Sequence, residues 1–283
     1  MRRILAIISA GNAEIGVYIY QRSGWPEFRW DNERVFAMLA EVRHRQGRWI
    51  GRMESMGFSL RNQAELSTLT EDVLKTSEIE GERLQTDQVR SSIARRMGLE
   101  IAAAMPADRH VDGVVEMLLD ATRQYDRSLT EDRILAWQAA LFPSGFSGLR
   151  RIRVGAWGNQ DSGPMQVVSG PVGREKVHFE APDAQVIPQE MARFLAWFNA
   201  PEAVDPVLKS ALAHLWFVTI HPFEDGNGRI ARAIGDMQLA RSERSPHRFY
   251  SLSAQIQAER QGPPHVGARL DNWTMVSNSK LAR

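Results

Sequence analysis

The sequence contains no cysteine, and this absence excludes disulfide bonds, thiolate metal sites and cysteine nucleophiles together. It also fits a reducing compartment, so the expected location is the cytoplasm. Long hydrophobic runs are missing as well, because no segment approaches the roughly 20 apolar residues that span a bilayer. The apolar run at the N-terminus stops at Ile8, which is shorter than the core of a signal peptide. A soluble protein without membrane association is therefore expected.

An excess of charge of either sign is also lacking. Lys and Arg total 35, Asp and Glu total 34, and the formal net charge is +1. Such a balance offers no general attraction to nucleic acid or anionic lipid, so a nucleic-acid partner is not indicated. The 283 residues, of which 43% are hydrophobic, are enough to bury one sizeable core and a second, smaller one.

Helical periodicity covers most of the chain and favours an all-α protein. The apolar spacing and end signals predict helices from about Asn32 onwards and at Leu60–Gly81, Val111–Gln124, Glu131–Leu141, Pro188–Asn199, Asp205–Ile220 and Gly228–Ala240. Between Gly145 and Pro188, glycines interrupt short β-rich segments, which predicts loops and a hairpin. That hairpin either covers a ligand or simply connects two helices.

One predicted helix carries a carboxylate at the end of an otherwise apolar stripe. The stripe consists of Leu66, Leu69, Val73, Thr76 and Glu80, spaced 3, 4, 3 and 4 residues apart. Gly81 follows as a helix-stop residue, and the negative end of the helix dipole disfavours a carboxylate there. Taken alone, Glu80 fits a solvated helix end better than a buried site, because Glu is almost never buried unless paired. In a buried site it needs a compensating cation.

The twelve residues 221–232, His-Pro-Phe-Glu-Asp-Gly-Asn-Gly-Arg-Ile-Ala-Arg, hold the densest chemistry of the chain. Gly226, Asn227 and Gly228 can turn the backbone so that several N–H groups point the same way. The helix that begins at Arg229 adds its positive dipole end to that concavity. This segment therefore predicts an anion site, placed directly after an apolar core helix.

The residue types around this turn suit phosphate or nucleotidyl transfer. A carboxylate at Asp225 can hold Mg²⁺ between two phosphates, and Arg229 and Arg232 can bind phosphate oxygens bidentately. His221 is a candidate base, although an isolated histidine at the end of a core helix is more often structural. Zinc chemistry is not expected, because His221 and Asp225 have no clustered third ligand. The pattern is also neither a P-loop nor a dinucleotide fingerprint.

The pattern His-Pro-Phe-x-Asp-Gly-Asn-Gly-Arg-x-x-Arg resembles the signature of the Fic family at every signature position. The resemblance extends from about Trp25 to Ile256, and Trp25-Pro26-x-Phe28-Arg29-Trp30 is similar to the N-terminal region of bacterial Fic proteins. It implies an all-α fold, with a Fic-type helical core, a small β-hairpin flap and an N-terminal helical region.

The same resemblance implies three divisions of the chain. Residues 1–100 would form an N-terminal region with an inhibitory helix at about 60–81, and residues 101–258 a catalytic core with the flap at about 163–180. Residues 259–283 depart from the family, because Gly262, Pro263 and Pro264 break the next helix. This tail is interpreted as the atypical end of a truncated or frame-shifted product.

The resemblance further implies a protein adenylyltransferase, which moves AMP from Mg-bound ATP to a Ser, Thr or Tyr hydroxyl of a protein. His221 would be the catalytic base, Asp225 would hold Mg²⁺, and Phe223 would anchor the loop in the core. The implied nucleotide-binding set is Gly226, Asn227, Gly228, Arg229, Ile230, Ala231, Arg232, Val168 and Ser169. The last two belong to Gln166–Gly170, which would align the target chain by strand-like pairing.

An inhibitory pattern of the family, Ser/Thr-x-x-x-Glu-Gly/Asn, is matched by Thr76, Glu80 and Gly81. It implies that Glu80 pairs with Arg232 and takes the place of the γ-phosphate, so that the enzyme restrains itself. Self-modification and a homodimer are expected by family analogy. Two alternatives stay open: an enzyme that removes AMP or uses another nucleotide or phosphate donor, and a catalytically impaired regulatory or binding protein.

Overall fold

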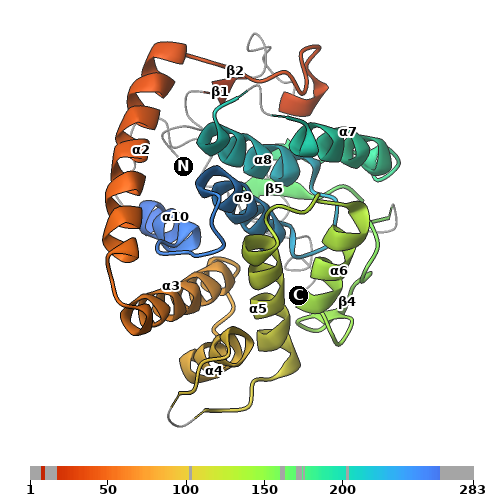
Figure 1. The fold of residues 1–283 in the computed structure, drawn as a ribbon. Helices are drawn as coiled ribbons and strands as arrows, with labels where there is room; N and C mark the ends of the chain where they lie inside the picture. Colours follow the sequence, from red (N-terminus) through yellow and green to blue (C-terminus); the bar gives the residue numbers. More distant parts are fainter. Residues whose placement is uncertain are drawn as a thin grey trace.

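The computed structural model describes residues 8–9, 18–101, 104–159, 163–169, 174, 176–201 and 204–261, and helices dominate them (Figure 1). The helices are η1 (Ile19–Gln21), α2 (Asn32–Glu54), α3 (Phe58–Ile79), α4 (Thr86–Met97), α5 (Arg109–Arg123), α6 (Glu131–Leu141), α7 (Ile187–Asn199), α8 (Pro206–Ile220), α9 (Asn227–Glu243) and α10 (Leu252–Gln261). The described strands form antiparallel pairs: β1 (Ile8–Ser9) with β2 (Arg29–Trp30), β3 (Phe146–Ser147) with β4 (Arg150–Arg151), and β5 (Gln166–Ser169) with β6 (Lys176–Glu180). The prediction of a helical protein with a hairpin is confirmed.

Side-chain caps explain why several helices begin close to their predicted starts. The Thr130 hydroxyl accepts a hydrogen bond from the Arg133 N–H at 3.2 Å and begins α6. The Asp205 carboxylate accepts from the Val207 N–H at 2.8 Å and begins α8. None of the described helices combines the length and hydrophobicity that a membrane span requires.

Helix α4, like α10, is an element that the sequence pattern did not predict. Its buried face combines the apolar Val89, Ile93 and Ala94 with the small polar Ser91 and Ser92. A face of this composition gives only a weak apolar period, because two of its five buried residues are polar. The packing of α4 against α3 and α5 therefore had no strong signal in the sequence.

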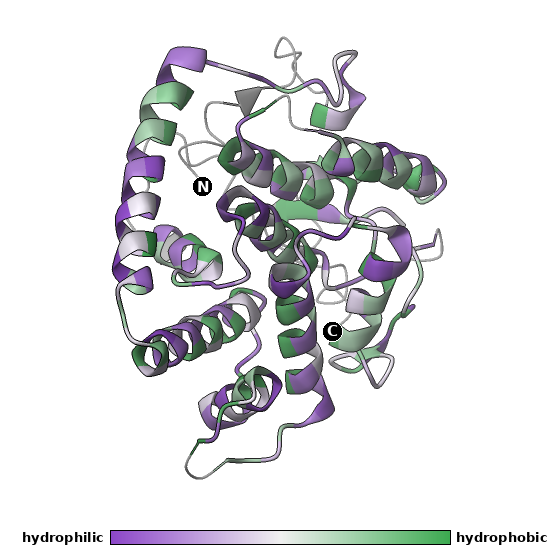
Figure 2. Cartoon of the chain, viewed as in Figure 1, coloured by the Kyte–Doolittle hydropathy of each residue, from purple (hydrophilic) through white to green (hydrophobic). Residues whose placement is uncertain are grey.

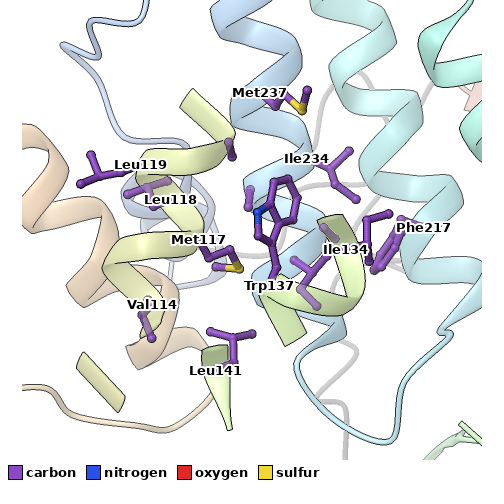
Figure 3. Close-up of a cluster of buried hydrophobic side chains, with 14 of the residues drawn as sticks. Val114, Met117, Leu118, Leu119, Ile134, Trp137, Leu141, Phe217, Ile234 and Met237 are labelled. Atoms are coloured by element: carbon purple, nitrogen blue, oxygen red, sulfur yellow. The ribbon is translucent and has the colours of Figure 1, made fainter. Parts of the chain in front are cut away.

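Helices α8 and α9 occupy the centre of the molecule, with α5 packed along α9 and α7 along α8 (Figure 1). Figure 2 shows α8 as largely hydrophobic, whereas α2 on the periphery is mostly hydrophilic. The close-up in Figure 3 shows Trp137 of α6 among Met117 of α5, Phe217 of α8 and Ile234 of α9. This core fixes the end of α8 and the start of α9, and the segment between them carries the predicted anion site.

The contact between α5 and α6 depends on a glycine. A Cβ atom added to Gly113 would lie 1.8 Å from the carbonyl oxygen of Ala140, so the two backbones could not keep their distance. We expect Gly113→Ala to lower the free energy of unfolding by about 3 kcal/mol, as overpacking in a rigid core does. Urea denaturation measures the change. Gly47→Ala, at an exposed site in α2 with no atom within 4 Å, is the matched control and should stabilise by up to about 1 kcal/mol.

Candidate active site

His221 caps the C-terminal end of α8 in a left-handed backbone conformation, with φ 52° and ψ 58°, and donates its N–H to the Phe217 carbonyl at 3.0 Å. This conformation is uncommon for a residue with a side chain and recurs at functional sites. Burial lowers the pKa of the His221 imidazole to about 4, although the carboxylates of Asp225 and Glu80 act in the opposite direction. With this pKa the His221 imidazole is neutral and able to accept a proton throughout the physiological range.

The loop after His221 is fixed by one aromatic side chain and one amide. Phe223 is 3% exposed, and its ring centroid lies 5.0 Å from that of Trp157. The Asn227 side chain accepts from the Phe223 N–H at 3.0 Å and donates to the Phe223 carbonyl at 2.7 Å. The side-chain amide of Asn227 therefore makes its hydrogen bonds within the loop. The backbone N–H of Asn227 is the group that can face a ligand.

The N-terminus of α9 has the geometry of an anion site. Gly226 caps the helix with φ 91°, and the helix leaves the N–H groups of residues 227–229 without carbonyl partners inside it. The Ile230 N–H already donates to the Gly226 carbonyl at 3.0 Å, and the side chains of Ile230 and Ala231 are buried in the core. The Ile230 N–H therefore completes the first helical turn, and the assignment of Ile230 and Ala231 to the nucleotide-binding set stays a prediction.

The carboxylates of Glu224 and Asp225 are held by the β3–β4 hairpin. The Asp225 carboxylate accepts hydrogen bonds from the Ser147 hydroxyl and, at 2.6 Å, from the Gly226 N–H. Arg150 of β4 forms a salt bridge with Glu224 at 3.0 Å. In the part of the chain that the structure describes, no three or more His, Cys, Asp or Glu side chains are grouped as metal ligands would be. A magnesium ion at Asp225 would thus need phosphate oxygens and water as its other ligands.

Arg232 meets the end of α3, about 150 residues away in the chain. Its Nε donates to the Thr76 hydroxyl at 2.7 Å, and its Nη2 donates to the Thr76 carbonyl at 3.0 Å and to Glu80 Oε1 at 2.7 Å. The Arg232 side chain is 6% exposed, whereas that of Glu80 is 26% exposed. Glu80 forms the C-cap of α3, and Gly81 turns the chain with φ 85°. The structure thus brings Thr76, Glu80 and Arg232 together as the sequence predicts.

The Glu80 carboxylate also lies against the first turn of α9. A Cβ atom added to Gly228 would lie 2.2 Å from Glu80 Oε1 and 3.2 Å from Arg232 Nη1. A negative group at a helix N-terminus is favoured by the partial positive charge there. The sequence predicts that phosphate binds the backbone turn at Gly228 and the guanidinium of Arg232. Glu80 lies next to both groups.

Arg229 is engaged by a carboxylate that the sequence pattern did not single out. It is 1% exposed, its Nη1 donates to Glu82 Oε2 at 2.7 Å, and its guanidinium carbon lies 5.0 Å from the centre of the Phe142 ring. Glu82 Oε2 also lies 3.0 Å from Nε2 of His110, whose Nδ1 is 3.0 Å from the Leu141 carbonyl oxygen. The sequence did contain a signal for this contact. In Glu-Gly-Glu at residues 80–82, a second carboxylate follows the turn at Gly81.

The pKa values of Glu82 and His110 are both shifted by their surroundings. Burial opposes the charged form of Glu82, but the hydrogen bond with His110 and the charge of Arg229 hold the pKa of Glu82 below its usual value. The hydrogen bond with Glu82 raises the pKa of His110, against the effects of burial and of Arg229. The Glu82 carboxylate therefore lies between the Arg229 guanidinium and the His110 ring, whose charged form it favours.

The raised pKa of His110 predicts a pH-dependent stability. Its contribution is fully present below the ordinary histidine pKa, near 6.5, and is lost as the pH rises through the higher folded-state value. We expect the melting temperature of the wild type to exceed that of His110→Gln at pH 6, and the gap to shrink towards pH 9. Other histidines titrate alike in both proteins and cancel in the difference. A gap that is the same at every pH would show that folding leaves the pKa of His110 unchanged.

The hairpin of β5 and β6 stands beside His221. Val168 pairs with Val177, after an irregularity in the register next to Val167, and Ser169 pairs with Lys176. The pocket next to His221 is lined by the base of this hairpin, including Met165 and Ala181, and Val168 is not among the described residues that line it. Gly170, the last residue of the predicted flap motif, lies outside the described residues, as do residues 262–283 of the predicted tail. Helix α10 continues to Gln261, beyond the start of that tail.

The fold and the site together define a helical domain in which a carboxylate of the same chain, that of Glu80, covers the N-terminal turn of α9. Residues 128–239, which include this site, match the Fic/DOC family. This segment of the chain is therefore a Fic domain. Residues 18–99, which include Glu80, match a domain of unknown function, DUF4172.

Curated relatives resemble this chain over short segments. Protein adenylyltransferase fic-1 of Caenorhabditis briggsae is 35% identical over 80 residues, which are 28% of this chain and 15% of that protein. The probable protein adenylyltransferase aq_aa38 of Aquifex aeolicus is 38% identical over 56 residues, or 20% of this chain and 18% of that protein. The matched segments thus span less than a fifth of either relative. They support a transferase of the Fic type.

A solved structure supports the fold. The Fic domain containing signaling protein of Bacteroides thetaiotaomicron superposes with a TM-score of 0.54 at 23% identity, over 71% of this chain and 72% of that chain. At this identity the likeness concerns the fold alone. The fold of the described residues is accordingly of the Fic type.

Proposed function

We propose that the protein is an auto-inhibited protein adenylyltransferase, which transfers AMP from Mg-bound ATP to Ser, Thr or Tyr hydroxyls of target proteins, itself included. The observation that carries the proposal is the contact of Glu80 Oε1 with Arg232 Nη2 at 2.7 Å, directly beside the N-terminal turn of α9. A carboxylate in that position stands where a phosphate would bind. The adenylyltransferase names of the relatives support AMP as the group transferred.

The chemistry needs a base, an anion site and a leaving-group site. The neutral imidazole of His221 would take the proton of the target hydroxyl, whose oxygen then forms a bond to the α-phosphorus of ATP. The bond from that phosphorus to the next bridging oxygen breaks, and pyrophosphate leaves. The N–H groups of residues 227–229 would stabilise the negative charge that develops on the phosphate oxygens. Arg229 and Arg232 would bind the outer phosphates.

Magnesium fits the oxygen groups beside the turn. Asp225 offers a carboxylate next to the Ser147 hydroxyl, and both are hard oxygen ligands of the kind that Mg²⁺ prefers. A single carboxylate is enough for an ion that is held mainly by the phosphates of its substrate. The ion would neutralise phosphate charge and orient the phosphates, while Asp225 keeps it on the side of His221.

One experiment distinguishes the proposal from its alternatives. The wild type and Glu80→Gly are incubated with Mg²⁺ and labelled ATP, CTP, GTP or UTP, and self-modification is read by mass spectrometry. Label from ATP, stronger in the variant, supports the proposal. Label from another nucleotide indicates a different transfer, and release of AMP from the modified protein indicates the reverse reaction. No transfer from any donor, with both proteins folded, contradicts the proposal and favours a catalytically impaired binding protein.

A further inference from the structure

Two carboxylates, one on each side of Gly81, engage the two arginines of the anion site. Glu80 contacts Arg232 and Glu82 contacts Arg229, each with an N–O distance of 2.7 Å. Gly81 adopts φ 85°, so the chain reverses between the two glutamates. Glu80 therefore closes the α3 side of the site, while Glu82 reaches Arg229 from the segment between α3 and α4.

The state of Arg229 indicates that it is held away from a ligand. Its side chain is 1% exposed, its Nη1 is taken by Glu82, and its Nε is buried without a hydrogen-bond partner among the described residues. An unpaired buried donor on a cation costs free energy that an anion could recover. Arg229 thus combines an occupied nitrogen with a vacant one, which is expected of a phosphate ligand that is only partly satisfied by the protein.

His110 fixes Glu82 in this position. Both ring nitrogens of His110 face acceptors, because Nδ1 is 3.0 Å from the Leu141 carbonyl oxygen and Nε2 is 3.0 Å from Glu82 Oε2. Two acceptors require two N–H donors, so the ring is an imidazolium. Glu82 is then bound by a cation of α5 as well as by Arg229 of α9, and neither bond involves Glu80. The Glu82 contacts can therefore persist when Glu80 moves away.

We propose that Glu82 is a second inhibitory carboxylate, which occupies the phosphate-binding nitrogen of Arg229 and is held there by His110. The inference rests on the proposed function, in which Arg229 binds a phosphate of the nucleotide, and it adds a separate restraint to that of Glu80. Loss of Glu80 alone frees Arg232 and leaves Arg229 occupied. Full affinity for the outer phosphates then requires that both carboxylates withdraw.

Binding of inorganic pyrophosphate tests the inference without any chemical step. Calorimetry compares Glu80→Gly with the double variant Glu80→Gly/Glu82→Gln, in which the amide keeps the size of the side chain and removes its charge. We expect pyrophosphate to bind the double variant about 10-fold more tightly, the factor that one charged hydrogen bond typically contributes. The matched control is Glu80→Gly/Glu78→Gln, because Glu78 is an exposed carboxylate of α3 that pairs with Lys75. It should bind pyrophosphate as Glu80→Gly does.

A second variant keeps the test independent of how well the first one folds. His110→Gln in the Glu80→Gly background removes the support of Glu82 without touching Arg229, and about 3-fold tighter binding is expected, because one hydrogen bond is weakened. Equal or weaker pyrophosphate binding in both variants would overturn the inference and make Glu82 a residue that positions Arg229. Absence of binding in every variant would overturn it too.

AMP transfer, measured on the same proteins, separates this inference from the proposed function. Tighter pyrophosphate binding without AMP transfer from ATP supports the role of Glu82 and contradicts the adenylyltransferase assignment. Transfer of AMP with no difference in pyrophosphate binding supports the assignment and contradicts the role of Glu82.

Discussion

Replacement of Glu80 by glycine is expected to raise the rate of AMP transfer by about 10- to 100-fold. Glu80 has no role in the proposed chemical step. Its carboxylate accepts a hydrogen bond from Arg232 Nη2 at 2.7 Å and fills the space beside Gly228. A hydrogen bond between charged groups contributes about 1.5 to 3 kcal/mol, which corresponds to this factor in the binding of a competing phosphate. The rate of self-modification with labelled ATP at fixed, subsaturating concentration measures the effect.

A glycine at residue 80 also loosens the end of α3, so the backbone effect has to be separated from the loss of charge. Glu78→Gly is the matched control, because it places the same residue in the last turn of α3 and keeps the Glu80 carboxylate. Glu80→Gln tests the charge alone and should also activate. If Glu78→Gly activates as strongly as Glu80→Gly, a loosened helix rather than a freed Arg232 is the cause.

The sequence predicted the parts of the proposed inhibitory contact that lie on regular helices. The stripe that ends in Glu80 follows the helical period, and the predicted helix is observed as α3. The core helix α8 begins within one residue of its predicted start at Asp205 and delivers His221 to the turn. The contact of Glu80 with Arg232 came from the family resemblance, since no local pattern joins residues about 150 positions apart.

The remaining parts depend on tertiary packing, which leaves no period in a single sequence. The contact of Glu82 with His110 requires that the reversal at Gly81 points towards α5, and the bond of Ser147 to Asp225 requires the β3–β4 hairpin to fold onto the turn. The low pKa of His221 is likewise a result of burial, which residue types alone do not reveal. Residue types therefore suggested the chemistry of the site, whereas the contacts of Glu82 with His110 and of Ser147 with Asp225 could not be read from them.

Replacement of His221 by alanine is expected to abolish the activity that Glu80→Gly releases, with a loss of about 10²- to 10⁴-fold, the usual contribution of a general base. The measurement is AMP transfer by Glu80→Gly and by Glu80→Gly/His221→Ala at saturating ATP. ATP affinity should stay within about 2-fold, because His221 is proposed to act on the target hydroxyl rather than on the phosphates. His44→Ala, at an exposed histidine of α2, is the control and should leave the rate unchanged.

The pH dependence of the Glu80→Gly rate tests the same assignment more sharply. A base works in its unprotonated form, so the rate falls as the pH drops through its pKa. Burial holds the pKa of His221 at about 4, and loss of the nearby Glu80 carboxylate lowers it further. The rate should therefore remain level from pH 8 down to about 5, where an ordinary histidine base would already be largely protonated. A fall of the rate centred near pH 6.5, or AMP transfer that survives His221→Ala, would show that a group other than the buried His221 imidazole is the base.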